Sequence, residues 1–344
     1  MALSDRRARI LAFVVDDYVD SATPVGSASL VQRHGLGLSS ATVRNEMAAL
    51  EGQGMLTHPH TSAGRIPSNP GYRYYVSSLM EEQALTRDEQ MTILHQFRQS
   101  ARDLENWIGL AASVLANAVG NMALVTEPRL KQVRLKQVQL VELAETSALL
   151  VVVTNDAAVH QRTLEFPVAV TQERLSRLAN RLNEQFGGKL ASELPSELAD
   201  DALGGVEGLV IATVADELLK AQRAAVETPV TEGVRQMLRQ PEFEGADSML
   251  DALEAVEERK LRSAIPADDV AAGSVAVVIG DENKEGPYTN MSFVLGRYGS
   301  DVGAGGIVGV LGPTRMGYSD AVSHVRYVSD VLTELLREFY GEVE

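Results

Sequence analysis

Hydrophobic residues near the start of the chain recur every three to four positions in three short runs, which is the spacing of amphipathic helices. The runs cover residues 4–18, 23–35 and 39–54, and turn-forming residues separate them. In the second run Thr23 is the expected N-cap, and Pro24 takes the first helical position, where a backbone N–H is not needed. Three short helices with a tight turn before the third predict a helix-turn-helix.

The third run combines a hydrophobic face with a polar face that suits base recognition. Either Ser39 or Ser40 can cap its first turn by accepting backbone N–H groups. Arginine can donate two hydrogen bonds to guanine and asparagine can pair with adenine, while serine and threonine reach base edges or phosphates. An ordinary surface helix has the same spacing, but a recognition helix in the major groove requires such side chains in its first turns. The candidate DNA-binding residues here are Ser39, Ser40, Thr42, Arg44 and Asn45.

Residues 55–67 predict a β-hairpin directly after the third helix, with Thr, Ser, Gly and His around its tip. A hairpin in this position forms a wing that lies along the phosphate backbone or enters the minor groove, where Arg65 would matter most. His58 and His60 have a spacing that zinc ligands use, but no cysteine or third ligand lies nearby, so we expect hydrogen bonding and no metal. The candidate DNA-binding residues at the start of the second helix and in the wing are Thr23, Ser27, His58, His60, Thr61, Ser62 and Arg65.

The pattern beyond residue 76 mixes helical periodicity with the alternation and apolar runs of β-strands. Tyrosines within residues 71–79 surround a helix start, so packing beneath the wing is favoured over stacking on bases. A polar helix is expected over 80–102 and a strongly apolar helix over 104–124. Together the elements predict an α+β fold with a central antiparallel sheet. The expected strands are 133–143, 148–154, 159–166, 275–279, 292–298 and 307–311, and the further helices are 173–186, 210–226, 230–238, 247–261 and 319–339.

Composition changes this picture mainly through charge. The chain of 344 residues has a net charge of −16 and no cysteine, which excludes disulfides, thiolate zinc sites and thiol nucleophiles. Residues 1–76, called the head below, carry seven arginines and six acidic residues, so the head is +1 and the remainder is −17. The acidic remainder should repel DNA, and useful affinity then requires specific contacts and two copies of the head. No apolar run has membrane-spanning length, and acidic residues interrupt residues 1–21, so a soluble cytoplasmic protein without a membrane partner is expected.

Two glycine-rich stretches look like nucleotide-binding loops but lack their defining residues. Residues 303–309 miss the third glycine of the dinucleotide fingerprint, and residues 312–317 lack the Gly-Lys-Ser/Thr of a phosphate loop. The six histidines are scattered and no Ser/His/Asp arrangement is visible, so we expect neither an enzyme nor a cofactor. A polar cluster after the expected strand 275–279 is either a solvated turn or a ligand loop with which an arginine can pair. Its residues are Asp281, Glu282, Asn283 and Arg315.

Four consecutive motifs in the head and two far downstream resemble the HrcA family, the bacterial heat-inducible transcription repressors. The motifs are Thr23–Ser27, Ser39–Asn45, Pro59–Pro67, Gly71–Val76, Ile279–Asn283 and Gly312–Tyr318, so the resemblance covers nearly the whole chain. It implies a homodimer that binds double-stranded DNA at an inverted-repeat operator, called CIRCE, upstream of chaperone operons. It also implies that the GroE chaperonin maintains the activity, and it places the recognition helix at Ser39–Gln53 and the wing at His58–Pro67.

The resemblance further implies a GAF-like domain interrupted by an inserted dimerisation domain. The chain then divides into a winged helix-turn-helix domain (1–76), a linker helix (77–102), a GAF-like domain (103–154 and 231–344) and a dimerising insert (155–230). The alternative function is a transcription regulator controlled by a small-molecule ligand in the GAF-like pocket. The polar cluster at residues 281–283, with Arg315, is the candidate ligand loop in that case.

Overall fold

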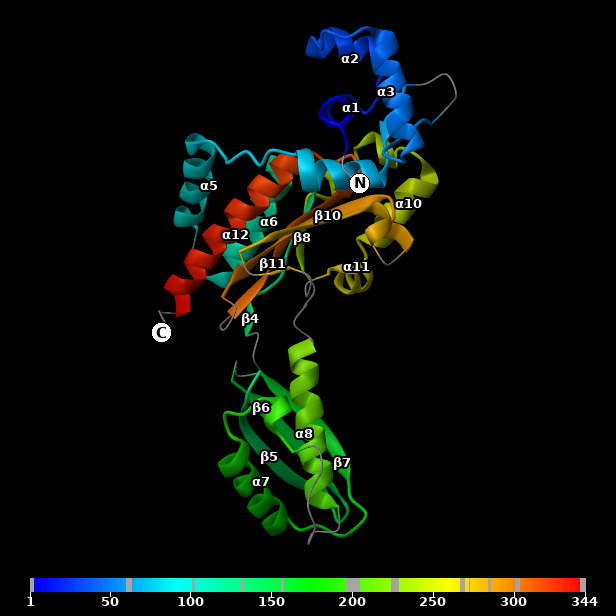
Figure 1. Cartoon of the computed structure of the whole chain (residues 1–344). Coiled ribbons are helices and arrows are strands. Elements are labelled where there is room, and N and C mark those ends of the chain that lie inside the picture. Colours follow the sequence, from blue (N-terminus) through cyan, green and yellow to red (C-terminus); the bar gives the residue numbers. More distant parts are fainter. Residues whose placement is uncertain are drawn as a thin grey trace. The chain divides into compact units, whose positions relative to one another are not determined.

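The computed structural model, shown in Figure 1, divides the chain into two units. Unit 1 comprises Met1–Glu127, Thr228–Gly299 and Gly306–Glu344, and unit 2 comprises Pro128–Glu227 and Ser300–Gly305. The structure describes residues 3–59, 64–100, 103–130, 133–155, 158–195, 205–223, 229–266, 270–271, 273–283, 286–300 and 304–340. None of the helices within these ranges is long and apolar enough to cross a membrane.

Three helices and a hairpin begin unit 1 in the order that the sequence predicts. The helices are α1 (Asp5–Ser21), α2 (Ser27–His34) and α3 (Ser40–Gly52), and the antiparallel strands are β1 (Leu56–Thr57) and β2 (Ile66–Pro67). Each helix buries one apolar face in a common core. Burial of an aliphatic side chain contributes about 1.5–3 kcal/mol, which holds the three short helices together. The fully buried side chains of this core include Ile10, Val14, Leu30, Val43 and Leu50.

The start of α2 differs from the sequence expectation. The sequence predicts Thr23 as the cap and Pro24 as the first helical residue, but the helix starts at Ser27. Val25 instead forms an extended bridge with Arg65, in which the Val25 N–H donates to the Arg65 carbonyl at 2.9 Å. The cause is non-local, because the return strand of the hairpin binds the segment between α1 and α2 and keeps it extended.

A sheet with strand order β8–β3–β11–β10–β9 forms the centre of unit 1. Its strands β8, β10 and β11 are labelled in Figure 1. The registers of β8 with β3, β3 with β11 and β9 with β10 are antiparallel. β4 belongs to unit 2 and pairs with Ala304 and Gly305, the two residues of β11 that also belong to that unit. The long helices α6 and α12 pack against each other, and α12 also packs on β10. The bounds are β3 (Met122–Val125), β4 (Arg129–Leu130), β8 (Val230–Glu232), β9 (Val275–Ile279), β10 (Met291–Gly299), β11 (Ala304–Pro313), α6 (Leu104–Val119) and α12 (Tyr318–Tyr340).

Two helices of this region are shorter than predicted. The apolar helix expected over 104–124 ends at Val119, because Gly120 adopts a left-handed conformation with a φ of 67°, and the chain continues as β3. The helix expected over 230–238 begins as the strand β8 and becomes helical only as α9 (Val234–Met237). Short runs of valine and leucine are compatible with either a strand or a helix, so the hydrophobic pattern does not predict where these helices begin and end.

The head and the sheet of unit 1 share one hydrophobic core, whereas the sequence predicts separate domains joined by a linker helix. Tyr72 of the head belongs to the same buried cluster as Trp107, Val294 and Tyr318. Of the expected linker, residues 77–79 end a π-helical turn, residues 80–86 have no regular secondary structure, and residues 87–99 form the shorter helix α5. The remaining elements of unit 1 are α4 (Asn69–Tyr74), η1 (Tyr75–Leu79), α5 (Arg87–Gln99), η3 (Pro241–Phe243), α10 (Ala246–Ala255), α11 (Glu258–Ala264), η5 (Gly280–Glu282) and η6 (Gly286–Tyr288).

Unit 2 contains an antiparallel sheet with strand order β5–β6–β7 and helices packed against it. Its own core includes Val138, Leu150, Leu178 and Val210. The sequence places the inserted domain at 155–230, but unit 2 begins at Pro128, because β5 and β6 pair with β7 and not with the other sheet. The bounds are β5 (Leu135–Ala144), β6 (Ser147–Thr154), β7 (Val159–Glu165), α7 (Gln172–Phe186), η2 (Ala191–Glu193) and α8 (Val206–Arg223).

Candidate nucleic-acid interface

A serine side chain caps the N-terminus of α3. Ser39 has extended backbone angles (φ −72°, ψ 150°), and its Oγ accepts the Thr42 N–H at 3.1 Å. The Thr42 hydroxyl lies 2.9 Å from Ser39 Oγ, so this threonine also takes part in the cap. Of the two serines that the sequence allows as the cap, Ser39 takes the role, and Ser40 is the first helical residue.

We expect Ser39→Ala to lower the free energy of unfolding by about 1 kcal/mol, because an N-cap serine satisfies a backbone donor that alanine leaves unpaired. Chemical denaturation of the full-length protein measures this change. Ser40→Ala is the matched control, since Ser40 is exposed and its hydroxyl has no hydrogen-bond partner among the described residues. Equal losses in the two variants would contradict the assignment of Ser39 as the cap.

The side chains that the sequence assigns to base contacts lie on the exposed face of α3. Ser40, Arg44 and Asn45 are exposed, whereas Val43 and Met47 are buried in the core. Within the described part of the chain, neither the Arg44 guanidinium nor the Asn45 amide has a hydrogen-bonding or ionic partner. Both groups therefore keep their donors and acceptors available to a ligand, and the buried face of the helix fixes the direction in which they point.

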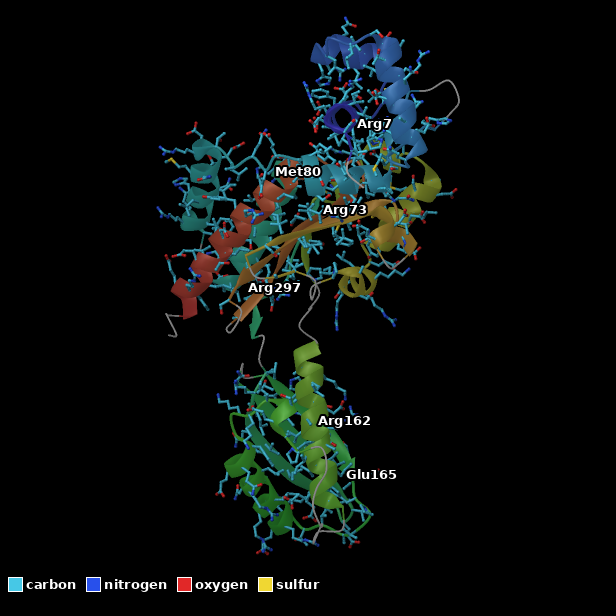
Figure 2. All side chains as sticks on the ribbon, viewed as in Figure 1. Arg7, Arg73, Met80, Arg162, Glu165 and Arg297 are labelled. Atoms are coloured by element: carbon cyan, nitrogen blue, oxygen red, sulfur yellow. The ribbon has the colours of Figure 1, made fainter. Side chains whose placement is uncertain are left out.

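A glutamate in the middle of α3 binds two arginines of α1. Arg7 Nε donates to Glu46 Oε2 at 2.8 Å, and Arg6 Nη1 lies 3.4 Å from Glu46 Oε1 (Arg7 is labelled in Figure 2). The pairing neutralises a carboxylate on the helix that would otherwise repel phosphate. Sequence reasoning did not assign Glu46 a role, and 39 positions separate it from Arg7, so no local pattern signals the pair.

A second glutamate near the end of α3 binds the hairpin segment. Arg65 Nε donates to Glu51 Oε2 at 2.8 Å, and His58 Nδ1 contacts Glu51 Oε1. The sequence assigns both His58 and Arg65 to DNA, and the structure brings them together on one carboxylate. Sequence reasoning missed Glu51, which joins the predicted recognition helix to the predicted wing.

The pKa of the Glu51 carboxyl lies below its usual value of 4.5, chiefly because Arg65 donates a hydrogen bond to the carboxylate, with a further bond from His58. A lowered pKa in the folded state stabilises the fold at higher pH, and this stabilisation is lost as the pH falls through the folded-state pKa. We expect the difference in thermal midpoint between wild type and Glu51→Gln to be largest at neutral pH and to shrink below pH 4.5. Glu244→Gln, at an exposed glutamate without a partner among the described residues, controls for the loss of one charge. A difference that stays constant with pH would argue against a stabilising role for this pairing.

The family described as HrcA protein C terminal domain matches residues 105–322 of the chain. The heat-inducible transcription repressor HrcA of Herpetosiphon aurantiacus is 40% identical over 347 residues, which cover 99% of this chain and 98% of that protein. The protein of the same name from Roseiflexus castenholzii is also 40% identical, with 98% and 96% covered. The chain belongs to the HrcA family. The fold of this HrcA-family chain also matches a crystal structure of a hypothetical protein, with a TM-score of 0.58 and 22% identity over 98% of this chain and 99% of that one.

The other DNA-binding residues predicted for this HrcA-family chain lie in different environments. Thr23 is exposed, and its hydroxyl donates to Ser21 Oγ at 2.9 Å. Ser27 is buried, with 8% of its surface exposed, which leaves little of it accessible to a DNA backbone. The three predicted wing residues His60, Thr61 and Ser62 lie outside the described residues.

The polar cluster after β9 is held by protein partners. Asn283 Nδ2 lies 3.0 Å from each of three carbonyl oxygens, and Glu282 accepts the Ile279 N–H at 2.8 Å. Glu282 also pairs with Arg73 of the head, whereas Asp281 is exposed. These contacts close the turn after the strand.

Arg315 does not pair with this cluster, contrary to the sequence expectation. Its guanidinium binds Glu242 and donates to the Val19 carbonyl at the end of α1. The physical reason is proximity in the fold, because the segment around residue 242 and the end of α1 lie against the loop that carries Arg315. The four predicted ligand-loop residues therefore do not form one site.

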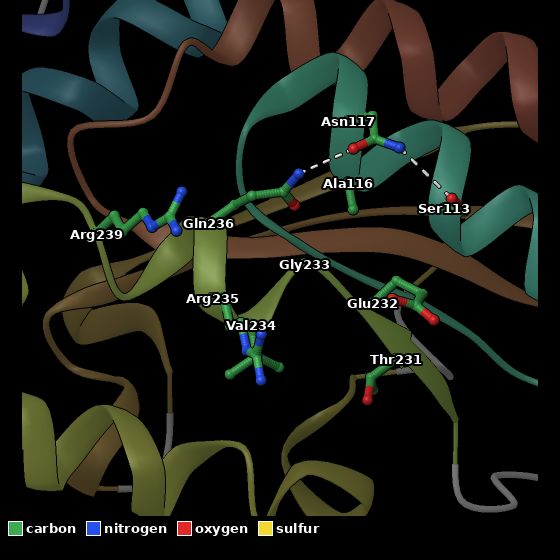
Figure 3. Close-up of a pocket in the computed structure, with 10 residues that line it drawn as sticks. All are labelled: Ser113, Ala116, Asn117, Thr231, Glu232, Gly233, Val234, Arg235, Gln236 and Arg239. Carbon is green, nitrogen blue, oxygen red and sulfur yellow. Dashed lines mark hydrogen bonds between the residues drawn. The ribbon is translucent and has the colours of Figure 1, made fainter.

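A cavity of about 520 Å³ lies elsewhere in unit 1, between α6 and the segment that follows β8 (Figure 3). Gln236 Nε2 donates to Asn117 Oδ1 at 2.9 Å on one side of it, and Arg235 and Arg239 also line it. None of the four predicted ligand-loop residues is among its lining residues. The two arginines and the amides can bind an acidic group of a small ligand, and the carboxylate of Glu232, which also lines the cavity, can pair with a cationic group of it.

Proposed function

We propose that this protein represses chaperone operons in the cytoplasm by binding an inverted-repeat operator of the CIRCE type as a homodimer. The chain belongs to a family of heat-inducible transcription repressors, so its role is transcriptional repression and not catalysis. The observation that carries the operator assignment is the capped helix α3, which presents Arg44 and Asn45 without partners among the described residues.

In this proposal the head is a winged helix-turn-helix, with α3 in the major groove and the hairpin as the wing. The order α1–α2–α3–β1–β2 and the bridge between Val25 and Arg65 support it. Arg65 is paired with Glu51, so a phosphate that reaches the wing competes with this carboxylate for the guanidinium. DNA binding then replaces the ion pair between Arg65 and Glu51 by a contact between Arg65 and a DNA phosphate.

The distribution of charge predicts that binding depends on specific contacts. The head is +1 and the remaining chain is −17, so few cations face the phosphates and the acidic part repels them. Non-specific binding should therefore be weak, and the salt dependence should be modest for a dimer. The second head of the dimer supplies the affinity that one nearly neutral head lacks.

We assign the sheet of unit 1 to a GAF-like domain and unit 2 to the dimerising insert. Unit 2 has a core of its own and, among its described side chains, exposes large apolar residues on β5 and β7. Exposed apolar surface of this kind is typical of protein–protein interfaces. These side chains are Val141, Leu143 and Val159, with 44%, 55% and 56% of their surfaces exposed.

The GroE chaperonin is the proposed protein effector. A chaperonin that rescues unfolded repressor raises the binding-competent fraction, and the apparent affinity for DNA scales with that fraction. When heat-damaged proteins occupy the chaperonin, the active fraction falls and the operons are transcribed. Dilution from denaturant with chaperonin should restore more operator binding than dilution without it, and equal recovery would contradict this mechanism.

The second candidate function is control by a small molecule bound in the GAF-like domain. The cavity in Figure 3, with its two arginines and the amides of Asn117 and Gln236, is the observation that favours it. A thermal-shift screen of small anionic metabolites separates the two mechanisms. A stabilising metabolite that also changes operator affinity would support the ligand-controlled regulator over the chaperonin-controlled one.

Fluorescence anisotropy with three DNA duplexes tests the operator assignment. The purified protein is titrated with an inverted repeat, a single half-site and a scrambled duplex at the same salt concentration, because salt alone changes affinity. We expect the inverted repeat to bind most tightly and the scrambled duplex most weakly. Equal affinity for the repeat and the scrambled duplex would rule out the proposed function.

A further inference from the structure

The head is packed directly onto the sheet of unit 1. Tyr72, in α4, is 2% exposed, and its ring lies 5.7 Å from that of Tyr318 at the start of α12. The side chains of Ile10 and Leu50 in the head and of Val294 and Val325 on the sheet side belong to the same buried cluster. A continuous core of this kind resists hinge motion, because close-packed interiors do not deform continuously.

Arg315 ties the end of α1 to the segment before α10. Its side chain is only 13% exposed, Nη1 donates to the Val19 carbonyl, Nη2 lies 3.2 Å from Gln240 Oε1, and Nε binds Glu242. A cation at the C-terminal end of a helix also interacts favourably with the helix dipole. One guanidinium thus joins the first helix of the head to two residues that are more than two hundred positions away in the sequence.

Arg73, on the helix α4 that follows the hairpin, links the head to β9 and the turn after it (Figure 2). Its Nε donates to Glu282 Oε1 at 2.6 Å, and its Nη2 binds both the other carboxylate oxygen and the Val277 carbonyl of the edge strand β9. A bidentate arginine–carboxylate pair restricts orientation as well as distance. The turn after β9 also lies close to the first residue of α4, because a Cβ on Gly280 would lie 2.3 Å from Asn69 Nδ2.

We propose that Arg73 and Arg315 are positioning residues, which fix the direction in which the sheet of unit 1 presents α3 and so narrow the range of half-site spacings that the dimer accepts. The inference rests on the proposed function as a dimeric repressor. Neither arginine is assigned to DNA itself. Together with the buried Tyr72, the two arginines hold the head at three places along its contact with the rest of unit 1.

A fixed direction of α3 has a measurable consequence for a dimer that binds DNA with two heads. Once one head is bound, the second binds with an effective concentration that depends on how well its position matches the other half-site. Heads with a fixed direction favour one spacing strongly, and loosely held heads accept several spacings with a lower affinity for the best one. Loss of the ties therefore changes the preference among spacings more than it changes the affinity of one head for one half-site.

The experiment compares wild type, Arg73→Gln, Arg315→Gln and the double variant as full-length proteins by fluorescence anisotropy. The duplexes are a single half-site, the preferred inverted repeat and a repeat whose spacer is longer by half a turn, about five base pairs. Arg337→Gln is the matched control, because it removes the same charge from a pair with Glu334 that is exposed on α12. Circular dichroism and Trp107 fluorescence verify that each variant is folded.

We expect the double variant to bind the single half-site as wild type does, to bind the preferred repeat about tenfold more weakly, and to discriminate less between spacers. The control should retain the wild-type preference. An unchanged spacer preference in the folded double variant would overturn the inference, as would an equal loss on half-site and repeat. If the double variant does not fold, Glu242→Gln and Glu282→Gln are tested by the same two criteria. A wild type that does not prefer the repeat over the half-site would instead refute the proposed function.

Discussion

Arg44→Ala is expected to weaken operator binding by about 1–3 kcal/mol per half-site, because a bidentate arginine–guanine contact contributes that much discrimination. The proposed dimer would use two half-sites, so the expected loss on the full repeat is about 2–6 kcal/mol, where each 1.4 kcal/mol is about tenfold in affinity. The structural basis is the exposed Arg44 guanidinium, which has no partner among the described residues and would engage DNA without breaking an internal ion pair. Anisotropy titrations with the inverted repeat measure the effect.

The control for this prediction is Arg98→Ala, which removes an exposed arginine of α5 that also has no partner among the described residues. It tests whether the loss follows from net charge or from position on α3. Base substitutions in the half-site add a second criterion, since Arg44→Ala should relax the preference at one guanine and Asn45→Ala at one adenine. Unchanged affinity and base preference in both α3 variants would remove α3 as the recognition helix.

Tyr72→Ala is expected to lower the free energy of unfolding by about 3–5 kcal/mol, as is typical when a fully buried aromatic side chain is truncated. Tyr72 lies in the head but packs on Tyr318 within the shared core, so the loss should appear in the fluorescence of Trp107, which lies in α6. Denaturant titration followed at Trp107, the only tryptophan of the chain, measures it. The large effect is a direct consequence of the shared core.

Tyr72→Phe is the matched control for the alanine variant. The Tyr72 hydroxyl is buried and has no hydrogen-bond partner among the described residues, so its removal should change the stability by less than about 1 kcal/mol. If Tyr72→Ala left the Trp107 transition unchanged, the head would unfold independently of the sheet. That outcome would also contradict the rigid presentation of α3.

Local signals in the sequence predicted the helices of the head well. The apolar spacing of Val43, Met47 and Leu50 predicted α3, and the serines before it narrowed the cap to Ser39 or Ser40, because capping and periodicity depend on residues within a few positions. The predicted start of α2 was wrong, because the observed start depends on the bridge between Val25 and Arg65, which is 40 positions later. A helix boundary that a distant strand determines has no local signal.

The partners of the charged residues were also beyond local inference. Glu51 lies within fourteen residues of both His58 and Arg65, yet sequence reasoning assigned both side chains to DNA, because no pattern distinguishes an internal pair from a phosphate contact. Arg315 was expected to pair with residues 281–283 and binds Glu242 instead, 73 positions away. Similarly, no local pattern shows that β5 and β6 pair with β7, so the boundary predicted at residue 155 differs from the start of unit 2 at Pro128.

Hydroxyl-radical footprinting on a duplex with the inverted-repeat operator tests the central claim most directly. A symmetric dimer that inserts two α3 helices protects two patches, related by the dyad of the operator and lying on one face of the duplex. We predict this pattern for the wild-type protein and the loss of both patches together in Arg44→Ala. Protection of a single patch, or none above that of a scrambled duplex, would contradict dimeric operator binding through α3.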